Sequence, residues 1–180
     1  MRMTHAALLV MLGPALAACT DLAPAPPTAP AAAALTLVEA PPLTLDLRCQ
    51  CGNFDITPDP DHPWISHVVL RGICQGTHLG RASVVIDQHA DFGARTLVGT
   101  KTITAANGDQ LRVQHFGTLT PLSPTRVDFG GPIEIVGGTG RFIDASGSGE
   151  FAGGADSAAN IGFYNLTALI RYAASGRALP

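Results

Sequence analysis

A glycine-rich stretch spanning residues 137–149 constrains this chain more than any other segment. Five glycines fall within its thirteen residues. Glycine adopts positive φ angles without steric cost, so this density predicts an irregular backbone instead of a regular element. We expect Gly137 and Gly138 to end a strand. Gly147 and Gly149 would then turn the chain back into the next strand.

The middle of this stretch predicts a single helical turn that extends to Ala145. Thr139 is suited to cap such a turn, because a threonine hydroxyl can accept a backbone hydrogen bond at a helix N-terminus. Phe142 is the one aromatic residue in the segment. We expect its ring to turn under the fold as a plug.

The rest of the chain consists of short runs that alternate apolar and polar residues, as half-buried strands do. We expect strands at 43–47, 64–71, 81–87, 94–104, 110–118, 126–129, 132–136, 149–152 and 160–172. Loops are expected between them at 55–63, 72–80 and 88–93. Asn107-Gly108 is typical of a two-residue hairpin turn. Helical periodicity is almost absent, so the pattern predicts an antiparallel barrel or sandwich.

The same alternation predicts which side chains face inward. In 64–71 one face carries Trp64, Ser66, Val68 and Leu70, and the other carries Ile65, His67, Val69 and Arg71. We expect Ala82, Val84 and Ile86 to point inward in 81–87. The more apolar faces of the two later strands are Leu111, Val113, His115 and Gly117, and Tyr164, Leu166, Ala168, Ile170 and Tyr172.

The glycine-rich stretch also resembles a known family signature. Its pattern Gly-Gly-Thr-Gly-x-Phe-x-x-Ala-x-Gly is similar to that of the dirigent and allene oxide cyclase barrels, and is carried by Gly137, Gly138, Thr139, Gly140, Phe142, Ala145 and Gly147. A group of bacterial secreted proteins with related barrels is similar too, and shares motifs at 77–81 and 105–109. The resemblance covers roughly residues 70–172. It implies an all-β fold, an antiparallel eight-stranded barrel of the calycin-like kind.

The resemblance implies no plant activity. Dirigent proteins usually have arginine where this chain has Ser146. The catalytic carboxylate and asparagines of the plant enzymes have no matching positions here.

The N-terminal sequence predicts where the protein is located in the cell. Arg2 precedes a short apolar run at 6–16, the pattern of a signal peptide over residues 1–18. The sequence Leu-Ala-Ala-Cys that ends at Cys19 resembles the bacterial lipobox, which implies lipidation of Cys19. Thr20 after the cysteine favours the outer membrane, with the protein facing the periplasm. The alternative is ordinary cleavage, which would release a soluble protein.

Residues 19–42 are rich in proline and alanine and predict a linker that holds a domain off the membrane. The barrel domain would then occupy 43–180, with a frayed tail from 173. The net charge of −3 comes without any basic run interleaved with aromatics, which disfavours nucleic acid as a partner.

Three cysteines remain if Cys19 is lipidated, namely Cys49, Cys51 and Cys74. An oxidising envelope favours a disulfide from Cys74 to either of the other two. A bridge between Cys49 and Cys51, free thiols, or a metal site completed by His78 are the alternatives. No second paired motif supports the metal site, so we expect no metal, and no motif predicts a cofactor.

Ligand contacts are predicted on the inward faces. His115 lies on an apolar-leaning face, where a histidine can bond a ligand or exchange protons near neutral pH. A satisfied core histidine is the alternative. Tyr164 shares the inward side of the last strand. We name both as candidate ligand contacts and no residue as catalytic.

Three functions follow from these patterns. The first is a lipid-anchored barrel that binds a small apolar ligand, because an eight-stranded barrel can hold one such molecule. The second is a structural or protein-interaction barrel presented at the membrane. The third is an isomerase or cyclase, for which His115 is the one acid–base candidate.

Overall fold

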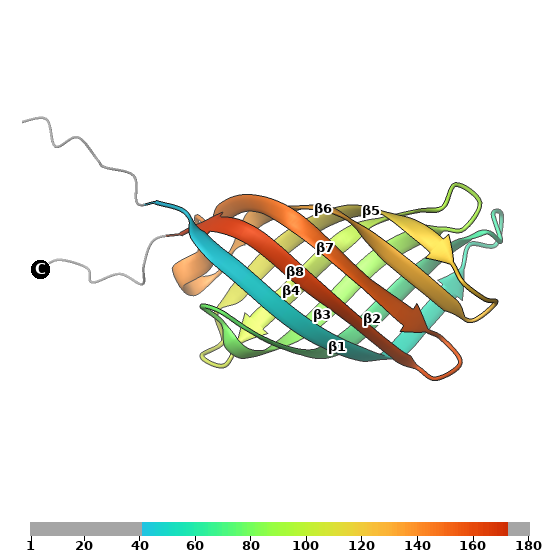
Figure 1. Cartoon of the computed structure of the whole chain (residues 1–180), viewed down its shortest axis with the longest axis horizontal. Coiled ribbons are helices and arrows are strands. Elements are labelled where there is room, and N and C mark those ends of the chain that lie inside the picture. The colour runs from blue at the N-terminus through green and yellow to red at the C-terminus, as the bar shows by residue number, and fades with distance from the viewer. Residues whose placement is uncertain (1–40, 173–180) are drawn as a thin grey trace, which may run out of the picture. The chain divides into compact units, whose positions relative to one another are not determined.

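The computed structural model of this chain describes residues 41–172. The expected signal peptide, the lipidation site at Cys19, most of the linker and the tail from 173 lie outside these residues. Within them, eight strands form a closed antiparallel barrel in which each strand pairs with the next and β1 closes against β8 (Figure 1). The strands are β1 Leu43–Pro58, β2 Ile65–Gly76, β3 Gly80–Asp91, β4 Thr96–Ala105, β5 Gln110–Pro121, β6 Arg126–Gly138, β7 Ser146–Asp156 and β8 Ile161–Arg171. This confirms the all-β, eight-stranded barrel.

The inward faces follow the predicted alternation. Side chains on one face of each strand are buried, and those between them are exposed. His115 and Tyr164 both point inward, as expected. In β2 the face of Ser66, Val68 and Leu70 is the buried one, and Trp64 precedes the strand and is half exposed.

The strands are longer than the alternating runs predicted. Residues 55–58, 72–76 and 88–91, expected in loops, belong to β1, β2 and β3, and 126–138 is one strand instead of two. Closure of the barrel explains the difference, since every strand has a hydrogen-bonding partner on both sides. Gly72, for example, pairs with Cys51 through backbone alone. A register shift between Gly52 and Asp55 marks a bulge in β1.

The glycine-rich stretch closes one end of the barrel. Gly137 and Gly140 have φ angles of 100° and 57°, which favour glycine. Between them the chain leaves β6 and forms the short 3-10 helix η1, Gly140–Phe142. Phe142 is fully buried, which confirms the plug. The helical turn is shorter than predicted. Thr139 occupies its N-cap position as expected, but its hydroxyl makes no capping hydrogen bond and instead accepts one from the backbone N–H of Gln110 at 2.9 Å.

Arg141 ties this plug to its neighbours at the same end. Its Nη2 donates to the backbone oxygen of His78 at 2.8 Å, and its Nε lies 3.7 Å from a carboxylate oxygen of Asp109. Its guanidinium also stacks 4.7 Å from the centre of the Phe142 ring. The predicted hairpin at 106–108 carries Asp109, with Gly108 at a φ of 89°. The three motifs at 77–81, 105–109 and 137–147 therefore meet at one end of the barrel.

A disulfide joins Cys49 of β1 to Cys74 of β2, which face each other across the strand pair. This settles the pairing that the sequence left open and leaves Cys51 as a buried free thiol. The alternative metal site is wrong, because two of its sulfurs are bonded to each other. No cluster of three metal-ligating side chains exists within residues 41–172.

Candidate ligand cavity

The opposite end of the barrel contains a cavity of about 340 Å³. Its wall comes from the hairpins β1–β2, β3–β4, β5–β6 and β7–β8, which all lie at the end away from Phe142. The wall is largely apolar, and its larger side chains include Phe54, Val68, Ile86, Phe92, Leu119 and Phe129. Among the described residues that line it there is no carboxylate. Such a cavity suits an apolar molecule.

The mouth is shaped by the bulge in β1 and by a proline-rich loop. The backbone N–H of Phe54 donates to the side-chain oxygen of Asn160 at 2.9 Å, and Asn160 holds a φ of 53° in the β7–β8 turn. This bond connects the bulge to the neighbouring hairpin and places the Phe54 ring against the cavity. Pro121 and Pro124 bring the β5–β6 loop to the opposite side.

Lys101 lies in the wall of this cavity, on an inward position of β4. Its side chain is 2% exposed. Nζ sits 4.0 Å from the centre of the Phe151 ring and 5.5 Å from that of Tyr164. Within residues 41–172 it has neither a hydrogen bond nor an ion pair. Burial lowers the pKa of Lys101 well below its ordinary value, so the amine is held toward its neutral form.

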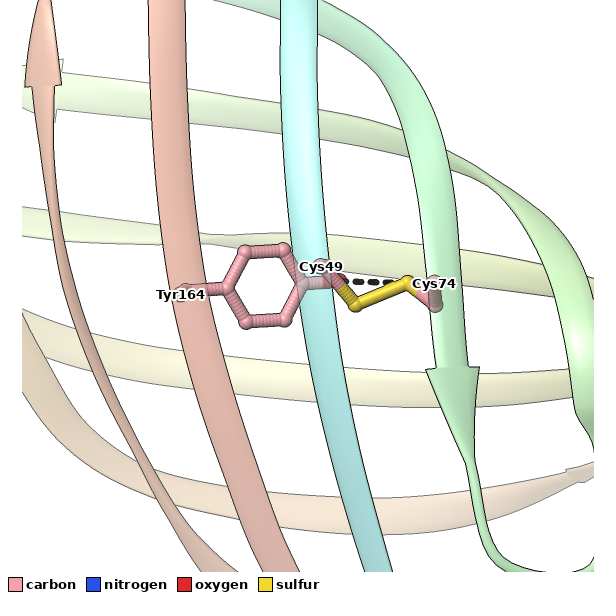
Figure 2. Close-up of a disulfide and its surroundings, with 3 residues drawn as sticks. All are labelled: Cys49, Cys74 and Tyr164. Carbon is pink, nitrogen blue, oxygen red and sulfur yellow. Dashed lines mark hydrogen bonds between the residues drawn. A yellow bond between two sulfur atoms is a disulfide. The ribbon is translucent and has the colours of Figure 1, made fainter.

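Cys51 and Tyr164 share this part of the cavity wall. Burial raises the pKa of the Cys51 thiol to about 11, against a weaker opposing effect of Lys101, so the sulfur keeps its proton. Burial likewise raises the pKa of Tyr164. Its hydroxyl lies 3.8 Å from the Cys74 sulfur, and Figure 2 shows the ring reaching from β8 across β1 toward the disulfide on β2. Both groups are therefore neutral proton donors.

His115 lies behind the wall instead of lining it. Its side chain is 3% exposed, and Nε2 donates to the side-chain oxygen of Gln88 at 3.0 Å, while Gln88 itself lines the cavity. Its Nδ1 has no partner among the described residues. Burial, assisted by Lys101, lowers the pKa of His115 to about 3, so the ring stays neutral at physiological pH. Its contact with a ligand would pass through Gln88.

The two predicted ligand contacts therefore differ in whether they line the cavity. Tyr164 lines the cavity, and His115 reaches it through Gln88. Sequence reasoning missed Lys101, although the signal was present. It is the only lysine in the chain, where every other Lys/Arg position is arginine. It also occupies an inward position in an alternating strand, where a charge is not expected.

Comparison with known protein families, with curated proteins and with solved structures finds no match for this chain. No helix in residues 41–172 has the length and apolar character that a membrane crossing requires.

Proposed function

We propose that this barrel binds a small apolar ligand in the cavity at its open end. The observation that carries the proposal is the cavity itself. Its volume of about 340 Å³ lies in the lower part of the range for ligand pockets, roughly 300 to 1,000 Å³. Its wall combines aromatic and aliphatic surface with a few polar groups, which is the usual composition of such sites.

The proposal also includes the cellular location of the protein. We propose an envelope lipoprotein, anchored through Cys19 to the outer membrane and facing the periplasm, with the barrel akin to the dirigent and allene oxide cyclase barrels. The support is the sequence pattern before Cys19 and the proline-rich spacer. Incorporation of labelled palmitate in the native host tests the anchor: Cys19→Ala should abolish the label, and a labelled variant would refute the site.

Displacement of a fluorescent probe tests the cavity. The full chain carrying Cys19→Ala lacks the proposed lipid anchor, so N-phenyl-1-naphthylamine can report binding to the protein itself. We expect saturable binding that 1-decanol displaces. Ala90→Phe places a ring in the cavity wall and should abolish probe binding, because Ala90 is buried there. Val98→Phe is the matched control, since Val98 is half exposed on the outer face. Equal binding by all three proteins would refute the cavity as the site.

A second candidate is a protein-interaction barrel, which one observation favours. Val98 and Phe116 are cross-strand neighbours on β4 and β5, and each is just over half exposed. Contiguous exposed apolar surface is a feature of protein–protein interaction sites. Sedimentation of the chain with and without Phe116→Ser tests this: an oligomer that the substitution dissolves would support it. An isomerase or cyclase has less support, because His115 does not line the cavity.

A further inference from the structure

We infer that Lys101 is a covalent attachment point: the cavity takes an apolar aldehyde or ketone, and the amine of Lys101 condenses with its carbonyl to form an imine. This inference rests on the proposed function, since it requires that the cavity admit an apolar ligand. It names the chemical class of that ligand and the atom that holds it.

The amine of Lys101 has no structural partner within residues 41–172. A buried lysine is ordinarily paired with a carboxylate, because burial of a lone amine is costly. Lys101 is 2% exposed, yet within the described residues its Nζ contacts only the faces of Phe151 and Tyr164. The cavity that it lines is the one space from which a partner can come. The fold therefore retains an amine that it does not use.

The use of lysine and not arginine at position 101 also supports the inference. Lysine and arginine together number 11, and Lys101 is the single lysine among them. Arginine stays charged in proteins and is a poor nucleophile, whereas a lysine loses its proton readily when buried. The sequence thus places its only lysine where the side chain can become neutral, and uses arginine elsewhere.

The ionisable groups that surround Lys101 are uncharged near neutral pH. Ionisable or polar groups face Lys101 from four strands: Cys51 on β1, Gln88 on β3, His115 on β5 and Tyr164 on β8. None carries a charge near pH 7, since the thiol and phenol keep their protons and the imidazole is neutral. No counter-charge holds the ammonium form. A neutral amine is the nucleophile that a carbonyl requires.

The chemistry then balances without an added reagent. The lone pair of Nζ attacks the carbonyl carbon, and one amine proton passes to the carbonyl oxygen to give a carbinolamine. The C–O bond breaks, the second amine proton leaves with the hydroxyl as water, and a C=N bond remains. Cys51 is a neutral donor that lines the same wall and interacts electrostatically with the amine, so its thiol can relay these protons. The product carries no charge, which suits the apolar wall.

An apolar carboxylate is the competing ligand, and the wall suits it less well. A buried ion pair is stable only when further hydrogen bonds satisfy the carboxylate oxygens. Near Lys101 the wall offers two aromatic faces and the weak S–H donor of Cys51, while the Tyr164 hydroxyl lies 3.8 Å from the Cys74 sulfur and the His115 Nε2–H is already donated to Gln88. The single nitrogen of an imine needs fewer hydrogen bonds than the two oxygens of a carboxylate.

Reductive trapping tests the inference on the full chain carrying Cys19→Ala. Decanal is added at pH 7, the imine formed after a set time is reduced with sodium borohydride, and the labelled site is mapped by peptide mass. A second protein also carries Arg112→Lys, which adds an exposed lysine as an internal reference. We expect Lys101 to label faster than the exposed lysine introduced by Arg112→Lys, because the neutral fraction of an amine rises about tenfold for each unit by which its pKa falls, until the pKa reaches the pH of the assay. Lys101→Met should lose the cavity label and keep only that at the chain terminus.

Two further ligands separate the possible failures, with displacement of N-phenyl-1-naphthylamine as the readout. If 1-decanol binds and decanal labels Lys101 faster than the exposed lysine, the inference stands. If 1-decanol binds but Lys101 labels no faster than the exposed lysine, the imine is refuted and the cavity proposal survives. Tighter binding of decanoate than of 1-decanol, lost in Lys101→Met, would replace the imine with an ion pair. If nothing binds, both proposals fall. Mapping in the parent protein keeps the test valid even if Lys101→Met does not fold.

Discussion

The two ends of the barrel are built by opposite means. At the closed end, three sequence motifs converge on Phe142, and Arg141 links the turn at His78 to Asp109 of the next hairpin. At the open end, the hairpins surround a cavity of about 340 Å³ whose wall includes an unpartnered lysine. The difference separates stability from binding: one end is filled by the protein's own side chains, and the other leaves space for a molecule.

The first way to break this contrast is to remove the plug. Phe142→Ala should lower the free energy of unfolding by roughly 3 to 5 kcal/mol, because a fully buried ring leaves a cavity that its neighbours cannot fill. Urea denaturation at pH 7 measures the change. Val136→Ala serves as the control, since Val136 precedes the same motif but is largely exposed. A loss below about 1 kcal/mol would mean that the ring does not seal the barrel.

The second way is to remove the buried amine from the open half. Burial lowers the folded-state pKa of Lys101, so the unfolded chain binds more protons, and stability rises with pH up to the unfolded pKa near 10.5. At neutral pH the lysine therefore costs stability. Lys101→Met, of similar shape, should stabilise the protein at pH 7, by about 1.4 kcal/mol for each unit by which burial lowers the pKa of Lys101, down to the pH of the measurement.

The pH dependence of that gain identifies its cause. Between pH 7 and 9 the advantage of Lys101→Met should shrink by at most about 1.4 kcal/mol per pH unit, because deprotonation of the unfolded lysine becomes less costly as the pH rises. This window lies above the range in which His115 titrates and largely below that of the buried Cys51 thiol. Denaturant titrations of both proteins at several pH values measure it. A gain that is constant with pH would point to better packing instead of deprotonation.

The contrast also explains what the sequence could predict. The closed end depends on backbone angles and hairpin turns that leave local signatures, such as Asn107-Gly108 and the glycines at 137 and 140. Strand faces were predictable for the same reason, since alternation is local. The open end depends on which distant strands meet. Nothing near Lys101 in sequence shows that Cys51, Phe151 and Tyr164 will surround it, because those contacts arise only when the barrel closes.

The smallest expected effect on stability lies at the mouth of the cavity. Phe92 lines the cavity but is nearly half exposed, at 45%, so Phe92→Ala should cost below about 1 kcal/mol in urea denaturation. Its effect on binding should be larger, because a ring at the mouth covers a bound molecule: we expect weaker retention of N-phenyl-1-naphthylamine and faster release in stopped-flow. Val98→Ala, exposed on the outer face, should change neither. If Phe92→Ala instead destabilises the fold as much as Phe142→Ala, the two ends do not divide stability from binding, because the mouth would then be as essential to folding as the plug.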